Sequence, residues 1–147
     1  MSAKTFVDTN VLVYAHDLDA GDRHAVAAKL VADLWETRNA VISTQVLQEF
    51  YVNATRKIPS PLPRAVARQI VKAYTAWQTE IVGPPEIEVA SELEEQHRLS
   101  FWDALIVAAA LKGGAGTILT EDMSSGRSIS GVRIENPFAE PAAPPAR

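Results

Sequence analysis

The chain has 147 residues, of which 47% are apolar and 22% charged, a composition typical of one globular domain with its own hydrophobic core. It contains no cysteine, which excludes disulfide scaffolds, thiolate metal sites and cysteine nucleophiles and favours a cytoplasmic location. Eighteen acidic against fourteen basic residues give a net charge of −4, so affinity for nucleic acid must come from local features.

The first part of the chain predicts strands and helices in alternation. The apolar, β-branched run 5–7 is typical of a strand and stops at polar residues. A short apolar segment, 11–15, follows, and apolar residues at three- and four-residue spacing then predict an amphipathic helix over 23–38. A brief buried strand is expected over 40–42, and the Ser-Thr pair after it is a typical cap for the next helix.

The middle of the chain predicts two more helices around a third strand. The proline-rich segment 58–63 ends the preceding helix, and a new helix is expected over 65–77. The residues of that helix expected to face the core are Val66, Ile70, Tyr74 and Trp77. A strand over 81–82 and a Gly-Pro-Pro turn lead into a helix over 86–98, whose early acids suit a helix N-terminus.

The last third of the chain predicts a buried helix and two further strands. The segment 99–111 is apolar almost all round, and Asp103 is its only ionisable residue. Glycines end this helix, and strands are expected over 117–119 and, after the loop 123–130, over 131–134. We therefore expect this helix to lie in the core and to feed the fourth strand.

Strands separated by helices predict right-handed crossovers and a three-layer α/β/α sandwich with a parallel sheet of four to five strands. We expect one domain over 1–138 and a disordered Pro/Ala-rich tail over 139–147. The most apolar stretch, 105–111, is too short to span a membrane, and the first residues lack the apolar core of a signal peptide, so no membrane association is expected.

Four carboxylates are expected at one edge of this sheet, because ligands of such folds bind at the carboxyl ends of the strands. Asp8 follows the first strand, and either Glu121 or Asp122 follows the fourth. Asp103 begins the buried helix, and Glu49 lies early in the helix after the second strand. The spacing leaves open which of the two adjacent acids points inward.

Each acid also has a purely structural interpretation. Asp8, with the Thr-Asn pair after it, suits a turn and a helix cap. Asp103 completes a capping box with Ser100, and Glu49 lies outside the centre of its helix's apolar arc, as a solvated residue would.

Taken together, the acids indicate a cation. Like charges about 4 Å apart repel by roughly 1 to 4 kcal/mol over the usual range of effective dielectric constants, so a cluster needs compensation. Protons can supply it, but an all-oxygen ligand set is what Mg²⁺ and Mn²⁺ prefer. Phosphate-bearing substrates complete the coordination of such ions, which points to phosphodiester hydrolysis.

The phrases FVDTNVLVYA, QVLQEFY, SFWDALIVAAA and LTED resemble the PIN-domain family, and within it the VapC-type toxins of bacterial toxin–antitoxin pairs. The resemblance covers roughly residues 5–138. It implies a PIN-like nuclease domain that binds Mg²⁺, or alternatively Mn²⁺, and hydrolyses RNA by metal-activated water. It also implies a cognate VapB-type antitoxin, and a homodimer is expected. By motif, the catalytic and metal-binding residues are expected to be Asp8, Glu49, Asp103 and Asp122.

Several other side chains have expected supporting roles. Thr9, Asn10, Thr120 and Glu121 are candidates for orienting the ligands or holding a phosphate, although turn chemistry explains the first three equally well. A basic group suits either contact with RNA or a solvated helix surface; it consists of Arg56, Lys57, Arg64 and Arg68.

Aromatic and histidine side chains are expected to play no part in the site. Trp102, Trp77 and Tyr74 could stack on bases, but their helical spacing favours packing in the core. The three histidines form no metal-ligand spacing and are assigned no role.

Two other functions fit part of the sequence. A catalytically silent PIN-like module would bind RNA or protein without cutting, although all four acids are present. A metal-dependent phosphatase would also place an Asp after its first strand, but Asn10 stands where its second Asp is required.

Overall fold

The computed structural model describes residues 3–139, so the expected tail beyond residue 139 lies outside the described residues. The strands are β1 (Lys4–Val7), β2 (Ala40–Ser43), β3 (Gln78–Glu80), β4 (Ala115–Leu119), β5 (Ser128–Ile129) and β6 (Val132–Glu135). They form one sheet in the order β3-β2-β1-β4-β6-β5, in which every neighbouring pair is parallel except β5 and β6. The carboxyl ends of β1 and β4, at the centre, therefore lie side by side.

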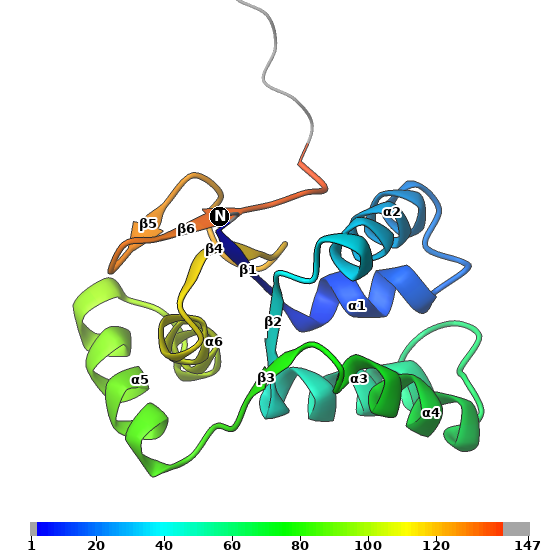
Figure 1. The fold of residues 1–147 in the computed structure, drawn as a ribbon, viewed down its shortest axis with the longest axis horizontal. Helices are drawn as coiled ribbons and strands as arrows, with labels where there is room; N and C mark the ends of the chain where they lie inside the picture. The colour runs from blue at the N-terminus through cyan, green and yellow to red at the C-terminus, as the bar shows by residue number, and fades with distance from the viewer. Residues whose placement is uncertain (1–2, 140–147) are drawn as a thin grey trace, which may run out of the picture.

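Helices cover both faces of this sheet. They are α1 (Thr9–His16), α2 (Asp22–Thr37), α3 (Thr44–Arg56), α4 (Arg64–Tyr74), α5 (Pro84–His97) and α6 (Phe101–Lys112). Figure 1 shows α1 to α4 on one side of the sheet and α5 and α6 on the other. The three-layer α/β/α arrangement predicted from the alternation of elements is confirmed.

The sheet has six strands where four to five were expected. The third strand is Gln78–Glu80, so the predicted position at 81–82 is wrong. The apolar residues that suggested it lie beyond the end of the strand, and Ile81 is 68% exposed. A half-buried edge strand of this kind carries no continuous apolar run to mark it. The two-residue β5 lies within the predicted loop 123–130, and it is too short to leave a pattern.

The helices differ from the expectations at several positions. The apolar segment 11–15, for which no element was predicted, belongs to α1, which begins at Thr9. The helix expected over 65–77 ends at Tyr74, and Val66 is 41% exposed instead of buried. Tyr74 and Trp77 are buried as predicted. Helical spacing identifies an apolar face, but only packing decides how far along the helix a neighbour covers it.

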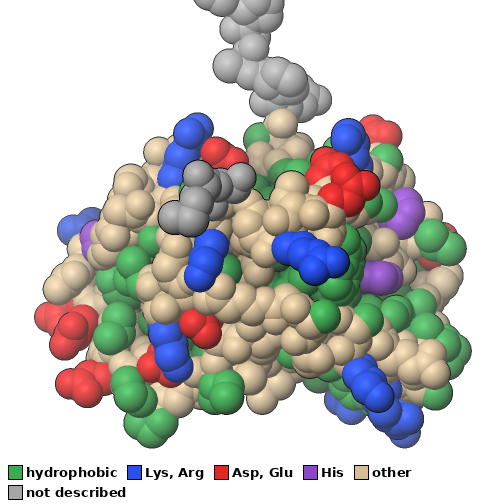
Figure 2. Space-filling view, in the orientation of Figure 1, with side chains coloured by type: hydrophobic (Ala, Val, Ile, Leu, Met, Phe, Trp, Pro, Cys, Tyr) green, Lys and Arg blue, Asp and Glu red, His purple; other side chains and the backbone are tan. Residues whose placement is uncertain are grey.

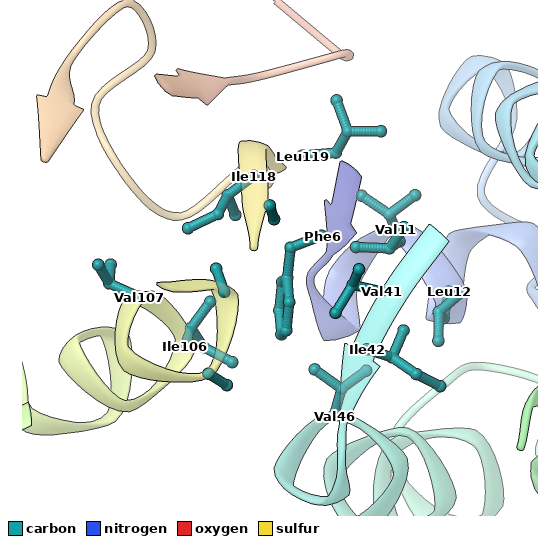
Figure 3. Packing of buried hydrophobic residues seen from close by; sticks show 14 of the residues in the cluster. Phe6, Val11, Leu12, Val41, Ile42, Val46, Ile106, Val107, Ile118 and Leu119 are labelled. Atoms are coloured by element: carbon teal, nitrogen blue, oxygen red, sulfur yellow. The ribbon is translucent and has the colours of Figure 1, made fainter. Parts of the chain in front are cut away.

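The core lies on both faces of the central strands. Figure 3 shows the Phe6 side chain beside Ile106 of α6, with Val11 and Leu12 of α1 on the opposite side of β1. In α6 every residue from 104 to 110 is buried, as its apolar composition predicts. This packing places the first turn of α6 at the edge where β1 and β4 end. Within residues 3–139, no helix combines the length and apolarity that crossing a membrane requires.

Candidate active site

Asp8 is the most buried carboxylate at this edge. It ends β1 and caps α1, and its Oδ1 accepts a hydrogen bond from the Thr9 backbone N–H at 2.7 Å. Its Oδ2 accepts one from the Thr120 hydroxyl at 2.7 Å. Burial raises the pKa of Asp8 to about 7 against these hydrogen bonds, and the negative charges of Asp122 and Glu49 add to the rise. The capping interpretation is therefore right, but it leaves a buried negative charge without compensation.

A polar network joins the start of α1 to the end of β4. The Asn10 amide donates to Asp122 Oδ2 at 3.0 Å and to Thr120 Oγ1 at 3.3 Å. Its Oδ1 accepts from the Glu121 backbone N–H at 3.2 Å, and the Asp122 N–H donates to Thr120 Oγ1 at 3.1 Å. Asn10 and Thr120 thereby hold the loop after β4 so that Asp122 lies toward Asp8.

Glu49 is held from two sides. The Thr9 hydroxyl donates to its Oε2 at 3.1 Å, and the amide of Gln45 donates to its Oε1 at 2.9 Å. The same Gln45 nitrogen donates to the backbone carbonyl of Trp102 at 3.2 Å. Glu49 is only partly exposed, so the solvated-surface interpretation is replaced by a bonded position between α1, α3 and α6.

Asp103 completes the group from the first turn of α6. Its backbone N–H donates to the Ser100 hydroxyl at 3.1 Å, which is the helix cap expected from the sequence. Burial raises the pKa of the Asp103 carboxyl, and the charges of Asp122 and Glu49 add to the rise. A hydrogen bond between the Ser100 side chain and this carboxyl opposes it. The charges of Asp122 and Glu49 thus act on both Asp8 and Asp103. Among the described residues, none of these four acids forms an ion pair.

Glu121 has a different environment from its neighbour. The Tyr14 hydroxyl donates to its Oε1 at 2.7 Å, and Arg23 Nε donates to its Oε2 at 2.6 Å. Burial alone would raise the pKa of Glu121, but the hydrogen bonds from Tyr14 and Arg23 and the charge of Arg23 lower it overall. Of the two adjacent acids, Asp122 is the one whose charge acts on Asp8 and Asp103, whereas Glu121 is paired with Arg23 and Tyr14.

A polar pocket of about 250 Å³ opens beside the acids, lined by Thr9, Asn10, Val13, Tyr14, Glu49, Asn53 and Asp122. Asn53 and Gln45 were not predicted for this site. Their spacing in the sequence could have indicated them, because residues 45, 49 and 53 recur every four positions on one face of α3. A larger groove of about 390 Å³ beside α3 and α4 is lined mainly by apolar side chains and by no carboxylate, so it is not the candidate site.

The donor set fits a hydrated cation better than a closed cage. Four carboxylates and the oxygens of Thr and Asn provide only oxygen ligands, which suits Mg²⁺ or Mn²⁺. Within residues 3–139, no three acidic or histidine side chains stand close enough to hold a metal ion as they are, since hydroxyl and amide donors separate them. Mg²⁺ keeps several of its waters and needs only one or two carboxylates directly. The raised pKa of Asp8 marks the uncompensated charge that such an ion would balance.

Trp102 contradicts its prediction, because its side chain is 65% exposed instead of packed in the core. Helix α6 is apolar all round, so its periodicity gives no indication of which residues the neighbouring elements leave uncovered. The four predicted basic residues are exposed near the end of α3 and the start of α4, and Arg56 lies seven positions after Glu49 on the same face of α3. Figure 2 shows a group of Lys and Arg side chains in the region where Figure 1 places α4.

Comparison with known proteins gives one family and several related folds. Residues 5–124 match the sequence family described as the PIN domain. No curated protein matches the chain in sequence.

Solved structures of toxins and toxin–antitoxin complexes share the fold. VapC20 of Mycobacterium tuberculosis, described as a sarcin–ricin loop cleaving toxin, is 24% identical, with a TM-score of 0.61 over 81% of this chain and 90% of that one. A toxin–antitoxin complex from Klebsiella pneumoniae is 21% identical, with a TM-score of 0.66 over 92% and 98%. VapBC2 of Rickettsia felis, bound to a promoter DNA fragment, is 18% identical, with a TM-score of 0.62 over 90% and 97%. At these identities, the likeness establishes the fold alone.

Proposed function

The chain belongs to the PIN domain family, and from that premise we propose that it is a Mg²⁺-dependent endoribonuclease and the toxin of a VapBC-type toxin–antitoxin system. One observation carries the proposal: Glu49 and Asp122 line one polar pocket, their charges act on Asp8 and Asp103, and among the described residues none of the four has a basic partner. A purely structural cluster of acids would be expected to be neutralised, as Glu121 is.

The four acids differ in burial: Asp8 is buried, Glu49 and Asp103 are half-buried, and Asp122 is exposed. Asp8 and Asp103 are proposed to hold the cation directly, and Glu49 and Asp122 to hold it through water or to hold a second ion. When bound, a divalent ion of this kind lowers the pKa of water and neutralises charge that develops on a phosphate. Thr120 keeps the Asp8 carboxylate oriented through its 2.7 Å hydrogen bond.

The pocket and the surface beside it provide the path for an RNA backbone. Thr9 and Asn10 line the pocket with hydroxyl and amide groups that can bind phosphate oxygens, and Asn53 extends this lining along α3. Arg56 continues the same helix face and begins the basic group around the proline-rich bend. We expect the scissile phosphate to lie over the acids and the neighbouring phosphates to reach these cations.

The related folds support the choice of substrate and partner. One structural neighbour is described as cleaving the sarcin–ricin loop, an RNA, and others are toxin–antitoxin complexes, some of them bound to DNA. We propose an RNA substrate, a VapB-type antitoxin as protein partner, a homodimeric toxin and action in the cytoplasm.

The test is cleavage of a panel of labelled structured RNAs by purified, antitoxin-free protein in EDTA, Mg²⁺ or Mn²⁺. Cleavage is expected only with the divalent ions, and D8N and D103N are expected to abolish it while E121Q retains it. The E121Q variant is a matched control because it neutralises an adjacent acid outside the group. Cleavage in EDTA, or undiminished cleavage by D8N, contradicts the proposal.

One observation favours a second candidate, the catalytically silent PIN-like module. The carboxylates are separated by bonded hydroxyl and amide groups and do not form a ready metal site within residues 3–139. A silent module would bind RNA or a protein partner, bind Mg²⁺ weakly or not at all, and cut no RNA under any of these conditions.

A further inference from the structure

Trp102 is the one large apolar side chain exposed on a helix that is otherwise the most buried in the described part of the chain. Its indole is 65% exposed, whereas every residue from 104 to 110 in α6 is buried. The core therefore does not require an indole at this position. Exposing so large an apolar side chain forgoes the free energy of burying it, which makes it a candidate for contact with a ligand.

The surroundings of Trp102 hold it in a defined place beside the acids. Its ring centroid lies 5.5 Å from that of Phe101, in an edge-to-face arrangement at 77°. Its backbone carbonyl accepts a hydrogen bond from Gln45, whose amide also donates to Glu49. Asp103 is the next residue, with its Cα about 3.8 Å away along the chain. The backbone of Trp102 therefore belongs to the hydrogen-bond network that holds Glu49, and its exposed indole belongs to the residue directly before Asp103.

We propose that Trp102 is a positioning residue on which an unpaired base of the RNA stacks, next to the phosphate held over the acids. The inference rests on the proposed function, which places that phosphate at Asp103. Aromatic rings bind bases of every kind through their faces, and they reach them only where the bases are unpaired. Because Trp102 is next to Asp103, a base on either side of the scissile phosphate would be the one nearest to the indole. Trp102 would thereby favour unpaired over paired RNA at the cleavage position.

The binding test uses tryptophan fluorescence and does not depend on cleavage. Wild-type protein is titrated with a single-stranded oligoribonucleotide, and with the duplex of the same sequence, in EDTA and again in Ca²⁺. The single strand is expected to quench the fluorescence and to bind more tightly than the duplex. W35F is the matched control, because Trp35 is 38% exposed on α2, and its ring packs at a tilt against that of Trp77, with 4.9 Å between the ring centroids. The quench is expected to persist in W35F and to be lost in W102F.

Affinity and kinetics then separate stacking from a merely structural role. W102A is expected to weaken binding of the single strand by roughly 5- to 100-fold, the loss typical of one base–aromatic stack. In Mn²⁺ the same variant is expected to raise KM by a similar factor and to leave kcat nearly unchanged. W102F keeps an aromatic face and is expected to restore most of the KM. Circular dichroism of W102A checks that the fold is intact.

The outcomes distinguish this inference from the proposed function. If wild-type protein cuts RNA but W102A has an unchanged KM, the inference is overturned and the proposed function stands. If wild-type protein cuts no RNA but single strands still quench Trp102, the proposed function fails and the stacking role stands as binding alone. If W102A alters the oligomeric mass in solution and leaves RNA affinity unchanged, Trp102 is a protein contact and the inference is wrong.

Discussion

Asp8 and Glu121 follow the carboxyl ends of adjacent strands, yet their surroundings shift their pKa values in opposite directions. Glu121 is paired with Arg23 and Tyr14, and its pKa is lowered. Asp8 is buried, has only neutral donors around it among the described residues, and has its pKa raised to about 7. Glu121 therefore has the environment of a structural ion pair. Asp8, by contrast, is costly to keep ionised unless a cation binds beside it.

The largest expected effect comes from neutralising Asp8, which removes the buried charge that distinguishes it from Glu121. D8N is expected to lower RNA cleavage by at least about 100-fold, since even residues that only orient metal ligands contribute 10- to 100-fold. The same variant should unfold at a higher temperature than wild type at pH 8 in EDTA, because it removes the desolvated charge. Cleavage assays and calorimetry measure both effects. A D8N protein that cuts RNA normally would remove Asp8 from the site.

The second prediction concerns pH and metal. Because the pKa of Asp8 is higher in the folded protein than in the unfolded chain, the folded state retains a proton that the unfolded state releases. Metal-free stability should therefore fall as pH rises from about 4 to about 7, by on the order of 4 kcal/mol for this group. Mg²⁺ should restore stability most strongly above pH 7. Denaturant unfolding in EDTA and in Mg²⁺ tests this, and D8N should weaken both dependences, leaving the smaller part that Asp103 contributes.

The third prediction removes the neutral donor from Asp8. T120V deletes the hydroxyl that donates to Asp8 Oδ2 and also accepts from Asn10 and from the Asp122 backbone. We expect a loss of about 1 to 3 kcal/mol in stability and a pH profile of cleavage shifted toward higher pH, because this hydrogen bond lowers the pKa of Asp8. T117V, in β4 just before Thr120 and outside the site, is the control. An unshifted profile in T120V would contradict the role of the hydroxyl.

The smallest expected effect comes from the adjacent acids after β4. D122N should lower cleavage about tenfold, as loss of a residue that acts on a metal through water does. E121Q should leave cleavage within about twofold, because its side chain pairs with a half-exposed Arg23 away from the acids. Steady-state kinetics of both variants in Mg²⁺ makes the comparison. If E121Q proves the more damaging of the two, Glu121 and not Asp122 belongs to the site.

Much of the fold could be predicted because its pattern is strong. The β-branched run of β1 and the all-apolar composition of α6 each predict an element buried in the core. The alternation of strands and helices predicts the three layers. The edge of the sheet could not be predicted in the same way. β3 is polar and only half-buried, so its pairing with β2 depends on neighbours that local sequence does not describe.

The candidate acids could be named from sequence, but their individual environments could not. Strand ends and motifs identified Asp8, Glu49, Asp103 and the pair at 121 and 122. Only the position of Arg23, about a hundred residues earlier in the chain, determines which member of that pair is neutralised.

The sequence by itself determined the alternation of strands and helices, the family and the candidate acids, because these depend on local pattern and on motifs that keep their order along the chain. The tertiary structure alone decided that Asp8 is buried among neutral hydrogen-bond donors, that the Asn10 amide binds Asp122, and that Trp102 is exposed. The physical reason is that burial and electrostatic compensation depend on which distant side chains arrive at the same place, and local sequence does not contain that information.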